Sequence, residues 1–390
     1  MKKLILSAAL ACAFFSCSED ADVVTNELNE SAVLATKSTI NIADIPTTAK
    51  LLSMIEINKT TIEEVKSRVS KSIKYGLGES ARFTDIIHPE NSKIYKIPTK
   101  SALYESLYDV CLNLKEFKDE SKVKEYLSLL SNTDLEILWP YAEDWKGEKN
   151  PFIAFVSDDQ NYIYRPKKDN KGTFYFDTIA VTADYIKNNP VWIISESSMP
   201  YDKLPDFEKG EFTNKDGMFF YSDYAIEKTQ KRTRAYEPGV YLATMRTTEV
   251  FESGLGGSNG EFYFYWLNVD NGRGGYTSMY RRINSSEVND ELQLNYKIRS
   301  PWGSAEVTNG LIIYESDGGK DKTGSRTLIY NNGTGNKNIP VSFPYQKNDD
   351  FILDKILYQT SICGDDNFSA DGSLKKYYGK SNFWITIAVK

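Results

Sequence analysis

The chain has 390 residues, of which 41% are hydrophobic and 26% are charged, a composition that is ordinary for a globular protein. Its formal net charge is −7, and no basic stretch is concentrated enough to follow a phosphate backbone, which argues against a nucleic-acid partner. Aromatic residues make up 13% of the chain, with 26 Tyr and 19 Phe, and this excess favours β structure.

The first 16 residues have the composition of an export signal. Lys2 and Lys3 supply positive charge, and the apolar run LILSAALACAFF that follows is too short to span a bilayer. The stretch FFSC ends at Cys17, which follows the small residue Ser16, and the acidic stretch SEDAD comes next. An ordinary signal peptide with an incidental cysteine is the alternative interpretation.

FFSC resembles the lipobox of bacterial lipoproteins, although Phe14 stands where leucine is usual, and SEDAD resembles the surface-export signal of lipoproteins in the Bacteroidetes. The resemblance implies cleavage after Ser16, a lipid on Cys17, and an outer-membrane location with the body facing the medium. The membrane is then a partner through this anchor, since two acyl chains suffice for stable attachment. Residues 17–43 are polar and predict a flexible tether.

Residues 44–227 are expected to form an α+β domain. Apolar residues recur at helical spacing in TTIEEVKSRVSKSIKYGLG, SALYESLYDVCLNLKEF and SKVKEYLSLLS, which predicts three helices. TDLEILWP is expected to add a helical turn that Pro140 ends. From Pro151 on, β-branched and aromatic stretches predict short strands, namely FIAFVSD, NYIYRP, TFYFDTIAV, VWIISES and MFFYSDYA.

Residues 228–238 are polar and basic and predict a linker, because a solvated linker is a more frequent role for such a charge run than a functional patch. Residues 239–390 then predict strand after strand, with clean alternation in ELQLNYKI and FWITIAVK and with turn residues between the strands. This pattern is typical of an antiparallel β-sandwich, and a closed barrel is the alternative. The predicted fold is therefore α+β and mostly β, a small N-terminal helical and β region followed by a C-terminal sandwich.

The single histidine, His88, limits the chemistry of the chain. A zinc protease of the HExxH kind needs two histidines, and a Ser–His–Asp or Cys–His set would have to use His88 as its base. GGSNG matches G-x-S-x-G around Ser258, but strand-like residues follow it and no histidine lies downstream, so a loop is predicted. No catalytic residues are therefore predicted. Cys111 and Cys363 are expected to be buried free thiols, with a disulfide as the alternative.

The most distinctive short stretch is WPYAEDWKG, residues 139–147. Trp139 and Trp145 flank Glu143 and Asp144, and such a set could form a sugar subsite in which aromatic faces stack on a pyranose. Adjacent carboxylates are nevertheless a poor glycosidase signal, because the acid and the base normally lie about 5–9.5 Å apart across the substrate. The alternative is a turn whose tryptophans pack into the core.

No cofactor is predicted, apart from Ca²⁺ as an alternative for the acidic loops of the C-terminal region. If two of these loops converge, their carboxylates could bind the ion with six to eight oxygens. Solvated turns are favoured, because no EF-hand spacing is present and Asp is common in turns for its own hydrogen bonds. The candidate ligands are Asp317, Asp321, Asp365 and Asp366.

Two classes of function follow from these features. The first is a non-catalytic surface lipoprotein that binds a glycan, a protein or another cell-envelope component. The alternative is a hydrolase that acts on glycans through carboxylates, with Glu143 or Asp144 as the best candidates. The body is similar, in style rather than in any motif, to uncharacterised two-domain lipoproteins of gut Bacteroidetes.

Overall fold

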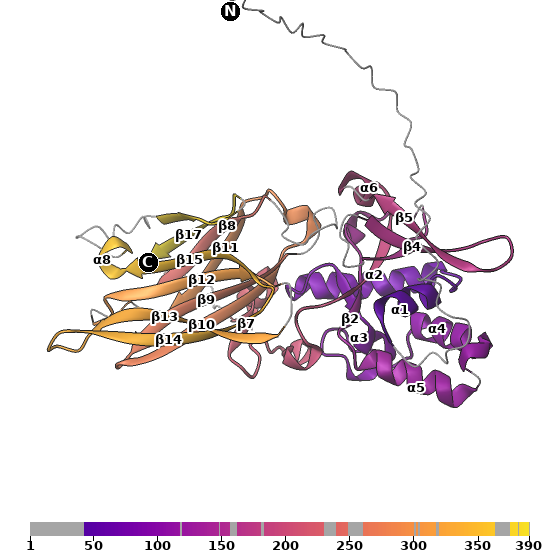
Figure 1. Ribbon diagram of the computed structural model, residues 1–390, viewed down its shortest axis with the longest axis horizontal. Helices are drawn as coiled ribbons and strands as arrows, with labels where there is room; N and C mark the ends of the chain where they lie inside the picture. The colour runs from indigo at the N-terminus through magenta and orange to yellow at the C-terminus, as the bar shows by residue number, and fades with distance from the viewer. Residues whose placement is uncertain are drawn as a thin grey trace, which may run out of the picture. The chain divides into compact units, whose positions relative to one another are not determined.

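The structure is a computed structural model, and its fold is α+β with more strand than helix, as the sequence predicts (Figure 1). It describes residues 43–117, 119–147, 149–156, 162–180, 183–229, 239–248, 260–299, 302, 305–316, 320–362, 375–380 and 382–389. Several sequence predictions fall on residues outside these ranges: the leader and SEDAD, Cys17, Ser258, Asp317, Cys363, Asp365 and Asp366.

A six-stranded sheet is the framework of the N-terminal half. Its strands lie in the order β1-β2-β6-β3-β4-β5, and neighbours are antiparallel except for β3 and β6, which are parallel. The strands are β1 (Ser80–Arg82), β2 (Leu135–Leu138), β3 (Phe152–Val156), β4 (Tyr162–Lys168), β5 (Phe174–Ala180) and β6 (Val191–Glu196).

The expectation of a helical turn in TDLEILWP is wrong, because LEIL forms strand β2. This strand pairs with β1 on one side and with β6 on the other, so both neighbours satisfy its backbone hydrogen bonds. All four residues are buried, including Glu136. The sheet that this short apolar run joins determines its strand conformation. Local periodicity could not distinguish this strand from a helical turn.

The three predicted helices are present, and each begins next to a polar side chain that accepts a hydrogen bond from the first turn. These residues are Asn58, Ser101 and Asp119, which accept from the backbone N–H of Thr61, Tyr104 and Lys122. The helices are α2 (Lys59–Lys74), α4 (Ala102–Asn113) and α5 (Glu120–Ser131). The further α-helices are α1 (Ile45–Leu52), α3 (Phe83–Ile87), α6 (Ala183–Asn188), α7 (Asp223–Thr229) and α8 (Gln359–Ile362).

The helices and the six-stranded sheet share one hydrophobic core. Val65 of α2 and Leu107 of α4 belong to the same buried cluster as Ile137 of β2 and Trp192 of β6. Cys111 of α4 is a buried free thiol in this cluster, and burial raises its pKa to about 12. Short 3₁₀ turns are η2 (Pro89–Asn91), η3 (Lys115–Phe117), η4 (Ala142–Asp144), η5 (Tyr201–Lys203), η6 (Phe207–Lys209) and η7 (Ser285–Glu287).

The C-terminal half contains a five-stranded sheet, a four-stranded sheet and a two-stranded hairpin (Figure 1). The five-stranded sheet has the order β15-β12-β9-β10-β7, and the four-stranded sheet has the order β11-β8-β17-β16. Pairing is antiparallel except between β7 and β10. The strands are β7 (Met218–Phe220), β8 (Val240–Arg246), β9 (Glu261–Asp270), β10 (Arg273–Arg282), β11 (Leu292–Arg299), β12 (Thr308–Glu315), β13 (Asp321–Asn331), β14 (Asn336–Gln346), β15 (Asp350–Tyr358), β16 (Lys375–Tyr378) and β17 (Trp384–Val389).

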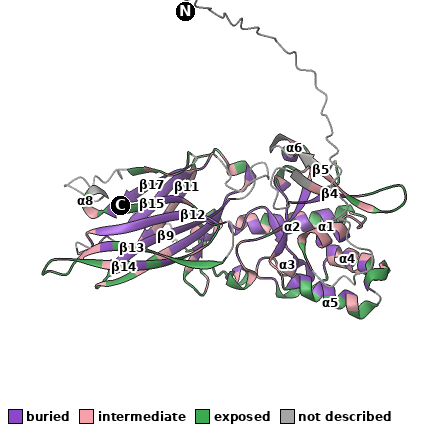
Figure 2. Cartoon of the chain, in the orientation of Figure 1, coloured by how far each residue is buried: buried purple, intermediate pink, exposed green. Residues whose placement is uncertain are grey.

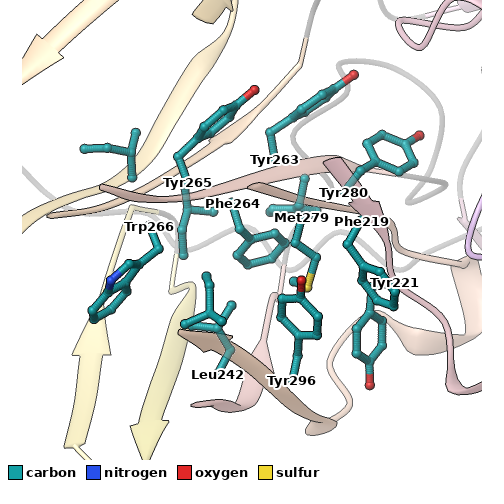
Figure 3. Close-up of a cluster of buried hydrophobic side chains, with 14 of the residues drawn as sticks. Phe219, Tyr221, Leu242, Tyr263, Phe264, Tyr265, Trp266, Met279, Tyr280 and Tyr296 are labelled. Carbon is teal, nitrogen blue, oxygen red and sulfur yellow. The ribbon is translucent and has the colours of Figure 1, made fainter. Parts of the chain in front are cut away.

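Strand β9 is buried on both of its faces, which explains its unbroken aromatic run FYFYW, residues 262–266. Figure 3 shows Tyr263 and Tyr265 on one side of the strand and Phe264 and Trp266 on the other. The ring of Tyr265 lies 6.0 Å from Phe343 of β14, so the hairpin covers the first side. Leu242 of the four-stranded sheet belongs to the core on the second side. Most of this strand is accordingly drawn as buried in Figure 2.

Strand β7 belongs to the five-stranded sheet although it precedes the predicted linker. The expectation that strand continues through MFFYSDYA is wrong beyond Phe220, because Ser222 accepts a hydrogen bond from the N–H of Ala225 and α7 begins at Asp223. Residues 230–238 lie outside the described ranges, so the domain division there stays a prediction. Among the described helices, none is long and apolar enough to cross a membrane.

Candidate functional site

The stretch WPYAEDWKG forms a sharp turn after β2. The backbone N–H of Trp139 donates to the carbonyl of Glu79 at 2.8 Å, which extends the ladder between β1 and β2 by one residue. Tyr141 then adopts the left-handed conformation with φ of 56°, which is uncommon for a residue that is not glycine. The turn η4 follows and leads to Trp145. A left-handed residue of this kind costs about 1–3 kcal/mol and persists only where its surroundings hold it.

The buried carboxylate of Glu79 accepts a hydrogen bond from the backbone of this turn. Its Oε1 accepts from the N–H of Tyr141 at 2.7 Å, and its Oε2 accepts from the N–H and the hydroxyl of Ser285 at 2.9 and 2.6 Å. Burial raises the pKa of Glu79, and the nearby charge of Glu143 raises it further, while the hydrogen bonds lower it. The carboxylate therefore connects the turn to the start of η7.

The two tryptophans of the stretch have different environments. Trp139 is only 1% exposed and meets Trp145 and Trp192 edge-on, each at a centroid distance of 5.8 Å. It is a core residue, so its ring cannot stack on a ligand. Trp145 is half-buried, and its indole Nε1–H donates to the carbonyl of Lys149 at 2.8 Å.

Lys66 of α2 fixes the position of Trp145. Its ammonium donates to the carbonyl of Trp145 at 2.9 Å and to that of Glu143 at 3.5 Å. The same ammonium lies 5.5 Å from the centroid of the Trp145 ring, within the range of a cation–π interaction. Helix α2 thus determines where the indole lies.

Trp145 lines a pocket of about 410 Å³, within the range typical of small-molecule sites. One wall comes from the turn after β2, and the other comes from the end of α6 and the segment that leads into β6. The side chain of Lys149 joins the walls, because its ammonium donates to Oδ1 of Asn189 at 3.3 Å. The lining residues are Pro140, Tyr141, Asp144, Trp145, Lys146, Lys149, Ile186, Lys187, Asn188, Asn189 and Pro190.

The carboxylates Glu143 and Asp144 are both exposed, and they are consecutive residues of η4. Asp144 lines the pocket and is the one carboxylate among its described lining residues. A glycosidase needs a second carboxyl group across the substrate. The pocket combines an indole, two side-chain amides and three ammonium groups with this carboxylate, a set suited to holding a polar ligand.

A second group of ionisable side chains is buried between strands of the two halves. Glu136 of β2 accepts from Nη1 of Arg282 at 2.7 Å, and Oε1 of Glu261 lies 3.4 Å from the same nitrogen. Arg82 donates to the hydroxyl of Ser197, which donates in turn to Glu261. Burial raises the pKa of Glu261, although the charge of Arg282 opposes this. These groups have almost no contact with solvent, so they act on stability and cannot bind a ligand from outside.

Asp321, the one calcium candidate that the structure describes, does not line the pocket, and neither does His88. Asp321 is exposed at the start of β13, where its Oδ1 accepts from the amide of Gln346 at 3.4 Å. Within the described ranges no group of three His, Cys, Asp or Glu side chains could hold a metal ion. His88 is about half exposed, and its Nε2 lies 3.2 Å from the hydroxyl of Ser131.

Asp144 and Trp145, two of the four residues singled out in WPYAEDWKG, line the pocket, and no residue of its second wall was predicted. Tyr141 and Lys146 lie inside WPYAEDWKG but gave no signal of their own. The second wall consists of the end of α6 and the two residues after it, between two predicted strands, and nothing in their sequence links them to position 145. No protein-family model matches this chain, and no curated protein matches its sequence.

Proposed function

We propose that the protein is a non-catalytic lipoprotein of the outer-membrane surface that binds a glycan in the pocket beside Trp145. The observation that carries the binding role is the pocket itself, in which an indole lies among amide, ammonium and carboxylate groups. Sugars offer apolar ring faces and many hydroxyls, so an aromatic ring with several hydrogen-bonding groups suits them.

A carboxylate-dependent hydrolase is the second candidate, and the pocket supports it less well. Asp144 would need an opposed carboxyl group, and the described lining residues on the α6 side are Ile186, Lys187, Asn188, Asn189 and Pro190. Glu143, the neighbour of Asp144 in η4, is not among the lining residues. A hydrolase would lose turnover in Asp144→Asn, whereas a binding protein has no turnover to lose.

Replacing Trp145 with alanine is expected to weaken glycan binding about tenfold, which corresponds to about 1.4 kcal/mol. The parent protein is titrated calorimetrically with dextran and xylan as neutral glycans, and with polygalacturonate and chondroitin sulfate as acidic ones, because three lysines line the pocket. Asp144→Ala is a second lining variant, whose exposed side chain can be removed without disturbing the core. It is expected to weaken binding to the same glycan.

Tyr378→Ala is the matched control, because Tyr378 is an aromatic residue of β16 that is 67% exposed and does not line the pocket. It should bind as the parent does. The proposal is overturned if none of the four glycans binds the parent, or if both lining variants bind with unchanged affinity. Measurable cleavage of any of the glycans would favour the hydrolase.

The lipid anchor has its own test. Cys17→Ala is expected to leave the membrane fraction, because the variant has no thiol to carry acyl chains. Changing Glu19, Asp20 and Asp22 to alanine is expected to keep the anchor and to lose protease accessibility on intact cells. If the triple variant stays as accessible to protease as the parent, the acidic stretch is part of the tether and is not an export signal. If Cys17→Ala remains in the membrane fraction, the lipoprotein proposal falls.

A further inference from the structure

We propose that Glu79 is a positioning residue for the pocket beside Trp145, whose carboxylate holds Tyr141 in the left-handed conformation that shapes the pocket wall. The expected effect of Glu79 on glycan binding rests on the proposed function, whereas its effect on the conformation of Tyr141 does not. Glu79 does not line the pocket, so it would act through the backbone of Tyr141.

The place of Tyr141 in the chain explains why its conformation matters to the pocket. It lines the pocket and is also the residue directly before η4, so its dihedral angles set the direction in which η4 leaves the sheet. Asp144 and Trp145 lie at the end of that turn and both line the pocket. If Tyr141 relaxed to a right-handed or extended conformation, both side chains would leave their present positions.

A carboxylate at position 79 fits this role and an amide does not. The carboxylate of Glu79 accepts a hydrogen bond from Tyr141 on Oε1 and two from Ser285 on Oε2. These two N–H groups and one hydroxyl are donors, and an ionised carboxylate is acceptor-only. Glutamine has the same shape but a single acceptor oxygen, so its amide nitrogen would face a donor on one side. Since Ser285 supplies two donors, the amide oxygen is expected to turn to Ser285 and the bond to Tyr141 is the one lost.

Burial of Glu79 makes the loss of its hydrogen bond to Tyr141 costly. Glu79 is 2% exposed, so water cannot readily replace it as the acceptor for the Tyr141 N–H. The adjoining contact, from the N–H of Trp139 to the carbonyl of Glu79, uses the backbone and survives the substitution. Glu79→Gln therefore changes the turn from Tyr141 onward and leaves the end of β2 in place.

The test is hydrogen exchange of the peptide that covers residues 139–147, combined with glycan binding, in the full mature chain. Glu79→Gln is expected to speed amide exchange in this peptide about tenfold and to weaken binding of the tightest of the four glycans by a similar factor. The matched control is Glu196→Gln, an exposed carboxylate at the end of β6, which should change neither. Unchanged protection of residues 139–147 in Glu79→Gln overturns the proposal.

A second variant separates positioning from general stability. Tyr141→Gly removes the cost of the left-handed conformation, since glycine adopts it freely. In that background Glu79→Gln is expected to change exchange and binding less than threefold. If Glu79→Gln alone does not fold, Tyr141→Gly is expected to restore folding. An equally large effect in both backgrounds, or a double variant that also fails to fold, contradicts the proposal.

The two proposals fail in different ways. If the parent binds none of the four glycans, the proposed function falls, while the exchange of residues 139–147 still decides the role of Glu79. If the parent binds a glycan and Glu79→Gln binds it equally well with unchanged exchange, only the role of Glu79 falls.

Discussion

Replacing Trp139 with alanine is expected to lower the free energy of unfolding by about 3–5 kcal/mol. The ring is 1% exposed and packs edge-on against Trp145 and Trp192, so the substitution removes buried apolar area and leaves a cavity at the centre of the N-terminal core. Urea unfolding followed by circular dichroism at neutral pH measures the change. The midpoint should fall with little change in the dependence on urea.

The control for this prediction is Tyr175→Ala, because Tyr175 is a large aromatic residue of the edge strand β5 that is 49% exposed. Its removal should cost much less than that of Trp139, since surface substitutions usually stay within about 0.5 kcal/mol. A midpoint for Trp139→Ala that equals that of the parent would show that the ring is not a core residue. The sugar-platform interpretation of Trp139 would then return.

Replacing Arg282 with methionine is expected to lower the free energy of unfolding by about 3–5 kcal/mol. The guanidinium is the partner of two buried carboxylates, at 2.7 Å from Glu136 and 3.4 Å from Glu261. Methionine keeps much of the volume but leaves both carboxylates without this charge, and an uncompensated buried charge is what makes such a substitution costly. The same urea experiment measures the loss.

Arg326→Met provides the comparison in an exposed pair. Arg326 and Asp354 form an ion pair in which both side chains are about one-third exposed, so the loss should be below about 1 kcal/mol. Adding Glu136→Gln to Arg282→Met should recover part of the stability, because it removes one of the two buried carboxylates that lost Arg282 and leaves Arg82 to offset the other. Equal losses in the two single variants, or no recovery in the double variant, would contradict the assignment of a buried ionic cluster.

Local pattern was sufficient for the elements whose sequence and surroundings agree. The helices α2, α4 and α5 carry apolar residues at helical spacing, and one face of each meets the core. Strand β11 alternates between buried and more exposed residues, as its sequence ELQLNYKI predicts. The segment of β2 was predicted as a helical turn and that of α7 as strand, and both predictions were wrong. The structure of such short segments depends on neighbouring strands and on capping residues more than on local periodicity.

The candidate site could be predicted only in part. The stretch from Trp139 to Trp145 stood out in the sequence, and the structure places its second tryptophan and Asp144 in the pocket. The roles of Glu79 and of the α6 wall depend on residues far apart in the chain, which no local motif brings together. The same holds for Glu136 and Arg282. In the sequence they resemble ordinary charged surface residues, and only the structure shows that both are buried.

The sequence by itself determined the helical and β-rich regions and the absence of a second histidine, because each of these depends on composition or on spacing within a few residues. Only the tertiary structure decided that Trp139 is core while Trp145 lines a pocket, and that the carboxylate of Glu79 accepts a hydrogen bond from Tyr141, which lies between them. Burial and hydrogen-bond partners depend on which distant segments meet. Two residues of the same type in one short stretch can therefore differ in burial, and no local pattern distinguishes them.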